Sequence, residues 1–249
     1  MTLSVAVPAR LSVERICLLV GVALIGSGLI HLAILIISGG SWEGPVSWRK
    51  PATFGVSFGL TLITVVWVSA YLPLRDRMRR ILLAVFALDC CVEVGGITLQ
   101  AWRHVPSHVN RETAFDSGVS TVLAAGGGIL VVVLGLLAVA AFRARAAPSM
   151  RLAIRAGFVT LMIGLASGAA MIARGVVAVN AGDQQRAYQV LGFLKPVHGV
   201  SLHGILVLPA IAWLLTFTSW DEARRTRLVW LAVIAYGVAV AGALIVSLT

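Results

Sequence analysis

The fold of this chain is decided by residues 117–142, which read SGVSTVLAAGGGILVVVLGLLAVAAF and contain no charged side chain. About 20 apolar residues in helical form are enough to cross the roughly 30 Å of hydrocarbon in a bilayer. Other apolar runs of similar length lie on both sides of this one. We expect seven runs to span a membrane, at residues 16–37, 52–72, 80–101, 117–142, 152–173, 197–217 and 227–248.

The composition supports this interpretation for the whole chain of 249 residues. About 59% of the residues are hydrophobic, 12% are charged and the mean hydropathy is +0.96, whereas a soluble domain carries about 25% charged residues. These values exclude a soluble enzyme, a disordered tail and a fibrous chain. Because backbone groups in lipid must bond within their own segment, we predict an all-α, polytopic membrane protein. Its seven transmembrane helices form a single domain over residues 1–249.

The basic residues indicate how the helices are oriented. A net charge of +10 would favour nucleic-acid binding in a soluble protein, but here the Lys and Arg residues lie in connections between apolar runs. Thirteen of the 20 lie on the side of the N-terminus and seven on the other side. Since basic loops stay in the cytoplasm, we expect a cytoplasmic N-terminus and an outer C-terminus. We expect a multi-pass protein of the bacterial cytoplasmic (inner) membrane that contacts lipid and no nucleic acid, and the oligomeric state stays open.

The histidines are confined to the outer side of this topology. They lie in outer loops or in the outer halves of spans. The five are His31, His104, His108, His198 and His203. A functional site in this protein is therefore expected to face outward.

Two carboxyl groups lie inside the third span. Asp89 and Glu93 are four residues apart and share one helix face, which Gly96 and Gln100 extend outward. A charged carboxylate at mid-bilayer costs roughly 2.5–3.5 kcal/mol on insertion scales. Two of them so close together also disfavour double ionisation. We regard Glu93 and Asp89 as candidate catalytic or proton-binding residues, and a structural interhelical hydrogen bond is the alternative.

Three potential metal ligands lie at similar depth in three different spans. His31 and His203 lie about 9 Å below the outer ends of their helices, and Glu93 lies about 12 Å below. Imidazole and carboxylate together suit iron, copper or zinc. We predict a transition-metal or haem site. The candidate ligands are His31, Glu93, His108, His198 and His203.

The remaining histidine spacings are weaker signals. His198 and His203 are five residues apart, which places them about 140° apart on a regular helix. His104 and His108 have the spacing of a chelating pair, but Pro106 between them disfavours a regular helix.

Basic and polar residues ring the same outer face. We expect them to bind an anionic substrate or a lipid headgroup, and anchoring of the spans at the interface is the alternative. The candidate substrate-binding residues are Lys50, Gln100, Arg103, Asn110, Asp116, Arg174 and Lys195.

A faint internal repeat is present. The segment KPATFGVS at residues 50–57 matches KPVHGVS at residues 195–201 with a one-residue gap. With the fourth span as a linker, spans 1–3 and 5–7 would be parallel three-helix repeats, an arrangement used by some small sugar transporters. The match is short, and chance similarity is the alternative.

Three outer-face motifs resemble those of a family of small bacterial multi-pass membrane proteins with no assigned activity. The motifs are Trp48-Arg-Lys-Pro51, Ser107-His-Val-Asn110 continuing to Phe115-Asp116, and His198-Gly-Val-Ser-Leu-His203. This chain has Val109 and Gly199 where the family pattern has aromatic residues. The resemblance supports the boundaries of the motifs and implies no activity.

Three functions fit these features. The first is a membrane-embedded metal or haem enzyme, redox in type, that acts on a lipid-soluble small molecule at an outer-leaflet His and Glu site. The second is a proton-coupled transporter in which Asp89 and Glu93 bind the proton. The third is a non-enzymatic membrane partner or assembly protein. No phosphate-binding or dinucleotide motif opens a cytoplasmic helix, which argues against the use of ATP or NAD.

Overall fold

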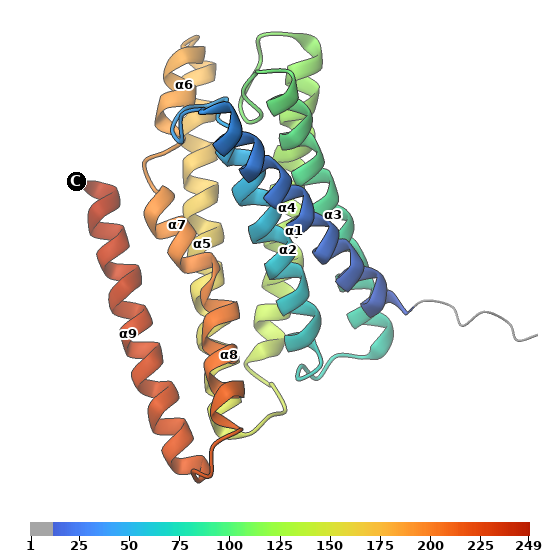
Figure 1. Cartoon of the computed structure of the whole chain (residues 1–249), viewed down its shortest axis with the longest axis vertical. Helices are drawn as coiled ribbons and strands as arrows, with labels where there is room; N and C mark the ends of the chain where they lie inside the picture. The colour runs from blue at the N-terminus through green and yellow to red at the C-terminus, as the bar shows by residue number, and fades with distance from the viewer. Residues whose placement is uncertain (1–11) are drawn as a thin grey trace, which may run out of the picture.

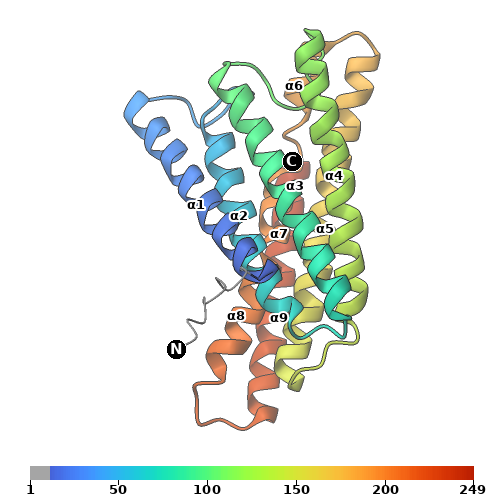
Figure 2. The ribbon, with the colours of Figure 1, turned by 90° about the vertical axis from the view of Figure 1, so that its right-hand side faces the viewer.

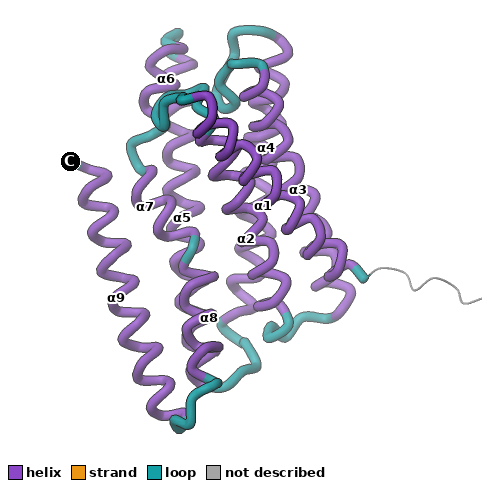
Figure 3. Tube along the Cα trace, viewed as in Figure 1, coloured by secondary structure: helices purple, strands orange, loops and turns teal. Residues whose placement is uncertain are grey.

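The computed structural model describes residues 12–249, and this part of the chain folds into helices joined by loops (Figures 1 and 3). Arg10, which contributes to the charge count, lies outside the described residues. The helices are α1 (Val13–Ser38), α2 (Arg49–Ser69), α3 (Asp76–Trp102), α4 (Ala114–Ala141), α5 (Pro148–Asn180), α6 (Gln184–Val190), α7 (Lys195–Leu202), α8 (Gly204–Leu215) and α9 (Glu222–Leu248).

Seven helices within residues 12–249 are long and apolar enough to cross a membrane, with α7 and α8 together forming one of them. The predicted all-α, seven-span architecture is confirmed to this extent. Two of the spans differ from the prediction in detail. Helix α5 continues past Arg174 to Asn180, and the guanidinium of Arg174 lies over the ring of Phe193, 4.6 Å from its centroid. The sixth span is interrupted at His203, where α7 ends and α8 begins.

The loops divide between two ends of the bundle. Residues 39–48, 103–113 and 181–194 gather at one end, here named the polar end, and α6 lies in the last of these segments (Figures 1 and 2). The other connections lie at the opposite end. The loops predicted to share the outer side therefore do lie together. Gly39 ends α1 at this end in the left-handed conformation, with φ of 63°, which a residue without a Cβ adopts at little cost.

The helices form two groups around α4. Helices α1, α2 and α3 contact one another, and α5, α7, α8 and α9 make a second set of mutual contacts. Helix α4 packs on α3 and on α5 and so links the groups, while α2 packs directly on α8. The helices before α4 thus pack together, as do those after it, and the internal repeat stays a prediction.

Helices α1 and α2 approach each other through glycines, and α1 crosses the bundle obliquely (Figure 2). A Cβ on Gly28 would lie 2.6 Å from the backbone N of Val56 and 2.7 Å from the carbonyl O of Ala52. A Cβ on Gly55 would lie 2.8 Å from the Cα of Gly28. Small residues at such positions let two helix backbones pack closely in lipid.

We expect Gly28→Ala to lower the free energy of unfolding by about 1–3 kcal/mol, because the added methyl group overlaps backbone atoms that cannot move independently. Gly26→Ala is the matched control, since a Cβ at Gly26 meets nothing within 4 Å. Thermal unfolding of both variants in mild detergent measures the difference. Equal midpoints for the two would show that the close approach does not stabilise the pair.

Candidate functional site

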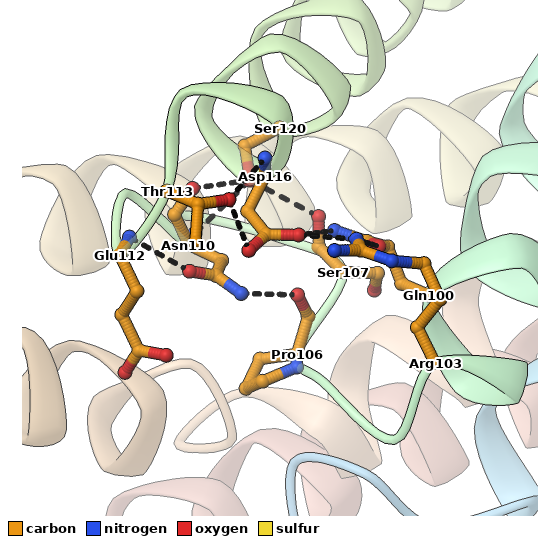
Figure 4. Close-up of polar contacts among 9 residues, drawn as sticks. All are labelled: Gln100, Arg103, Pro106, Ser107, Asn110, Glu112, Thr113, Asp116 and Ser120. Atoms are coloured by element: carbon orange, nitrogen blue, oxygen red, sulfur yellow. Dashed lines mark hydrogen bonds and ion pairs between the residues drawn. The ribbon is translucent and has the colours of Figure 1, made fainter.

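A polar network fixes the loop between α3 and α4 at the polar end (Figure 4). Its centre is the buried carboxylate of Asp116 in the first turn of α4. This carboxylate accepts hydrogen bonds from Thr113 Oγ1 at 2.6 Å and from Gln100 Nε2 at 2.8 Å, and it forms an ion pair with Arg103. Thr113 also caps α4 by accepting from the backbone N of Asp116. The network ties the end of α3 to the start of α4.

A second set of bonds shapes the middle of the same loop (Figure 4). Ser120 Oγ accepts from the backbone N of Asn110 at 3.0 Å and lies within bonding distance of the carbonyl of Ser107. The buried amide of Asn110 donates to the carbonyl of Pro106 and accepts from the backbone N of Glu112. Each polar group of Asn110 is therefore used to hold the loop in one conformation.

Two residues of this loop have a left-handed backbone without being glycine. His104 has φ of 55° and Val109 has φ of 52°, and the conformation is especially unfavourable for a β-branched residue. The carbonyl of Val109 accepts from Gln184 Nε2 of α6 at 2.8 Å, which helps to hold it there. Strain of this kind is concentrated at functional sites. The turn also separates His104 from His108, so the predicted non-helical path around Pro106 is confirmed.

The fixed loop places His108 between a lysine and a glutamate. Lys50 Nζ, in the first turn of α2, lies 3.2 Å from His108 Nδ1, and Ser107 Oγ lies 3.0 Å from the same atom. Because an ammonium group can only donate, Nδ1 accepts and the ring proton sits on Nε2. That atom faces Glu93 Oε2 of α3 at 4.0 Å. Lys50 of α2, His108 of the 103–113 loop and Glu93 of α3 thus form one line of titratable groups.

The line continues to Asp89. Both Glu93 and Asp89 are buried against Gly126 of α4, where a Cβ would lie 2.6 Å from Glu93 Oε1 and 2.8 Å from Asp89 Oδ1. Asp89 lies thirteen residues from each end of α3, or about 20 Å along the helix. Its Oδ2 atom is buried and has no hydrogen-bond partner among the described residues. The carboxyl pair therefore occupies the middle of the bundle in a gap that only glycine leaves open.

A small cavity adjoins this line next to Lys50. Its volume is about 10 Å³, and it is lined by Lys50, by Ile97 and Ala101 of α3, and by residues of the 45–47 and 105–107 segments. This volume is enough for about one water molecule.

His31 belongs to a separate aromatic cluster. Its Nδ1 donates to the carbonyl of Ser27 at 2.7 Å, and its Nε2 accepts from the indole of Trp102 at 3.2 Å. The ring stacks on Trp48, whose other neighbours are Trp102 and His104. Both nitrogens of His31 are engaged in hydrogen bonds, one within α1 to Ser27 and one to Trp102 that joins α1 to the end of α3.

His203 and His198 are held in the second group of helices. His203 Nδ1 donates to the carbonyl of Gly199 at 2.7 Å, and its Nε2 lies 3.3 Å from Ser57 Oγ of α2. His198 Nδ1 donates to the carbonyl of Gly164 at 2.8 Å. The Ser57 contact lies between the two helix groups, at the interruption between α7 and α8.

The histidines do not assemble into one centre in the structure. Among residues 12–249, no three or more His, Cys, Asp or Glu side chains lie close enough to hold a metal ion. The expectation that His31, Glu93 and His203 share a site is therefore corrected: equal depth along three helices did not mean adjacency. Binding of a metal or haem stays a prediction, which elemental analysis of protein purified without a metal-affinity column would test.

The predicted substrate-binding residues do not form one cluster. Gln100, Arg103, Asp116 and Asn110 hold the loop network described above, and Lys50 contacts His108. Lys195 Nζ forms an ion pair with Glu43 Oε2 at 3.0 Å across the polar end, and this contact together with Arg49 lowers the pKa of Glu43. Arg174 stacks on Phe193.

The sequence reasoning missed three residues that shape the site. Gly126 lies in a run of three glycines, and nothing in the sequence marks it as the neighbour of Asp89 and Glu93. Ser57 ends the repeated segment 50–57, but the sequence does not indicate its contact with His203. Thr113 was missed although Thr113 followed three residues later by Asp116 resembles a capping box, a recognisable start of a helix.

The protonation of His108 gives a pH prediction. Burial, with the Lys50 ammonium beside it, holds the pKa of His108 well below its usual value of 6.5. The unfolded chain therefore binds one more proton than the folded chain below about pH 6.5, and this group makes stability fall as the pH decreases. We expect His108→Gln to remove this part of the slope.

Thermal unfolding in detergent at pH 7.5 and pH 5.5 measures the effect. The midpoint of the wild type should fall more on acidification than that of His108→Gln. Glu93, the carboxyl group that faces His108, is present in both proteins. An identical fall in the two would show that His108 takes up its proton in the folded state.

Comparison of the chain with protein-family models, curated proteins and solved structures gives no match. The resemblance drawn on the outer-face motifs stays a prediction, and the functional argument depends on the geometry of the site.

Proposed function

We propose that this protein is a proton-coupled membrane carrier in which Glu93 and Asp89 bind the coupling proton. The observation that carries the proposal is the buried line of titratable groups from Lys50 through His108 to Glu93 and Asp89. A buried carboxylate without a counter-ion is costly in a bilayer, so the pair is expected to hold at least one proton. His108, neutral at pH 7, is suited to accept and donate protons along the line.

The position of the line favours a carrier over a channel. Beyond Asp89, the buried side chains of the α3 and α4 halves are apolar. They are Leu82, Leu83, Phe86 and Ala87 of α3 and Leu130, Val133, Leu134, Leu137, Ala138 and Ala141 of α4. A proton that reaches Asp89 from the polar end therefore meets an apolar barrier. Release on the other side requires a second conformation, which is the defining property of alternating access.

A change between two conformations would alter the contacts between the two helix groups. Contacts between them include the Glu43–Lys195 ion pair at the polar end, the Ser57–His203 contact in the middle, and the edge-to-face rings of Trp67 and Trp213 toward the opposite end. His203 lies at the interruption between α7 and α8. Interrupted helices at the interface of two repeats are typical of secondary transporters.

The positions of the histidines favour a metal or haem enzyme less than their spacing in the sequence does. His31 and His203 would each have to give up a hydrogen bond to bind a metal, and Glu93 lies against Gly126 and His108 instead. The carboxyl pair, in contrast, already has the burial and the neighbours that proton binding requires. On the charge bias of the loops, we place the polar end on the outer side of a bacterial cytoplasmic membrane.

A pH step applied to proteoliposomes on a solid-supported membrane tests the proposal without knowledge of the substrate. Proton binding about 20 Å inside the bundle moves charge through part of the membrane field. We expect a transient current that decays to zero, because the apolar half stops the proton. A sustained current would indicate a channel, and no current beyond that of protein-free liposomes would contradict proton binding at this site.

A further inference from the structure

A large apolar groove lies between α3 and α4 on the outside of the bundle. Its volume is about 510 Å³, within the roughly 300–1,000 Å³ typical of ligand sites. Its walls include Val92, Gly96 and Leu99 of α3 and Phe115, Gly118 and Val122 of α4. Four of these side chains are exposed and apolar, so in a membrane the groove opens to hydrocarbon.

The two walls of the groove are joined at two positions. Toward the polar end, Gln100 of α3 donates to Asp116 of α4. Toward the middle, Glu93 of α3 lies against Gly126 of α4. Between these two points Gly118 carries no side chain, and a Cβ there would meet nothing within 4 Å, so the surface is hollow at this position. The groove is thus a preformed feature of the α3–α4 pair, and it does not need a ligand to open it.

A guanidinium lies beside the end of the groove nearest the loop. The Cζ of Arg103 is 4.6 Å from the centroid of the Phe115 ring, which forms part of the groove wall. Arg103 is paired with the carboxylate of Asp116, and its hydrogen bonds to Gln100 and Asp116 both use Nη1. The side chain is 36% exposed, and its other N–H groups bond to neither of these partners. A guanidinium that is paired through one nitrogen can still donate to a second acidic group, which suits the acidic group of an amphiphile whose apolar chain lies in the groove.

We propose that the groove binds the hydrocarbon chain of an anionic amphiphile, whose acidic group contacts Arg103. The chain fills the hollow over Gly118, and its inner end reaches Leu123. Leu123 is packed on Gly96 and lies one helical turn from Gly126. This site stands independently of proton binding at Glu93, although a ligand there would press on the same stretch of α3 and α4.

Introducing a large side chain that occupies the groove tests the proposal. A Cβ at Gly118 meets nothing within 4 Å, so Gly118→Trp should fold and place its indole in the hollow. Gly128→Trp is the matched control, because Gly128 lies on the same helix, also meets nothing within 4 Å and does not line the groove. The probe is phosphatidylglycerol with a photoreactive acyl chain, in nanodiscs, with labelled residues mapped by mass spectrometry.

We expect preferential labelling of residues 92–99 and 114–123 in the wild type and in Gly128→Trp, and at least about fivefold less in Gly118→Trp, since the indole occupies the space of the chain. A phosphatidylcholine probe with the same chain should label the groove several-fold less. Labelling spread evenly over the lipid-facing helices, or unchanged by Gly118→Trp, would overturn the site. Equal labelling by the two probes would overturn the assignment of an anionic ligand.

Arg103 is tested separately. Arg103→Lys keeps the charge and should keep the preference for phosphatidylglycerol, whereas Arg103→Gln should lose it. Size-exclusion profiles and unfolding midpoints of both variants show whether the pair with Asp116 still holds the loop. Loss of the preference in a folded Arg103→Lys protein, or its retention in a folded Arg103→Gln protein, would contradict a role for the charge.

Discussion

Replacing Glu93 by Gln is expected to reduce the charge displaced by a pH step by about tenfold or more, because the amide cannot take up a proton at the place where the line of groups enters the bundle. The change conserves the size of the side chain and its contact with Gly126. Folding should be maintained, since an amide is less costly to bury than a carboxylate.

Glu43→Gln is the control for this variant. Glu43 also carries a carboxylate in an ion pair, but it is exposed in the loop between α1 and α2 at the polar end. Its loss should leave the displaced charge near the wild-type value. A wild-type current in a folded Glu93→Gln protein would show that protons bind elsewhere, and an equal loss in Glu43→Gln would assign the current to the surface.

The second large effect is expected at a residue with no titratable group. Gly126→Leu places a side chain where Glu93 and Asp89 now lie, with the first added carbon within 2.8 Å of both carboxyl groups. The carboxyl groups must move away, and the line from His108 is broken. We expect the displaced charge to fall by about tenfold or more, with a loss of stability of roughly 1–3 kcal/mol from overpacking.

Gly128→Leu is the matched control for Gly126→Leu. It changes the same residue type two positions along α4 at a site that faces open space. A current of wild-type size in Gly128→Leu and a loss in Gly126→Leu would assign the effect to the carboxyl pair. Equal currents in both variants, measured on folded protein, would show that the gap at Gly126 has no functional role.

Much of the fold was predictable because each span is an apolar run bounded by charges. The exceptions have physical causes. The sequence predicts that the fifth span ends before Arg174, but α5 continues to Asn180, with the guanidinium of Arg174 over the ring of Phe193. The interruption at His203 precedes Pro209 of α8, which has no N–H to bond the carbonyl of Ile205, and Gly204 approaches Thr160 of α5 closely at the same point.

The site was predictable in part. Asp89 and Glu93 stand out because charge inside an apolar run is rare, and their shared face follows from a spacing of four. Their partner could not be predicted. Depth along a helix made His31 and His203 the candidates, but His108 reaches Glu93 only because the 103–113 loop folds back through the left-handed turns at His104 and Val109. Such a path depends on tertiary bonds that residue spacing does not encode.

The central claim is that Glu93 binds and releases a proton inside the bundle. Infrared difference spectra of the protein in lipid, recorded between neutral and acidic pH, test it most directly, because a protonated carboxyl has its own carbonyl stretching band. The account predicts a band that appears on acidification, shifts in heavy water, and is lost in Glu93→Gln but kept in Glu43→Gln. The same band at full intensity in a folded Glu93→Gln protein would contradict it.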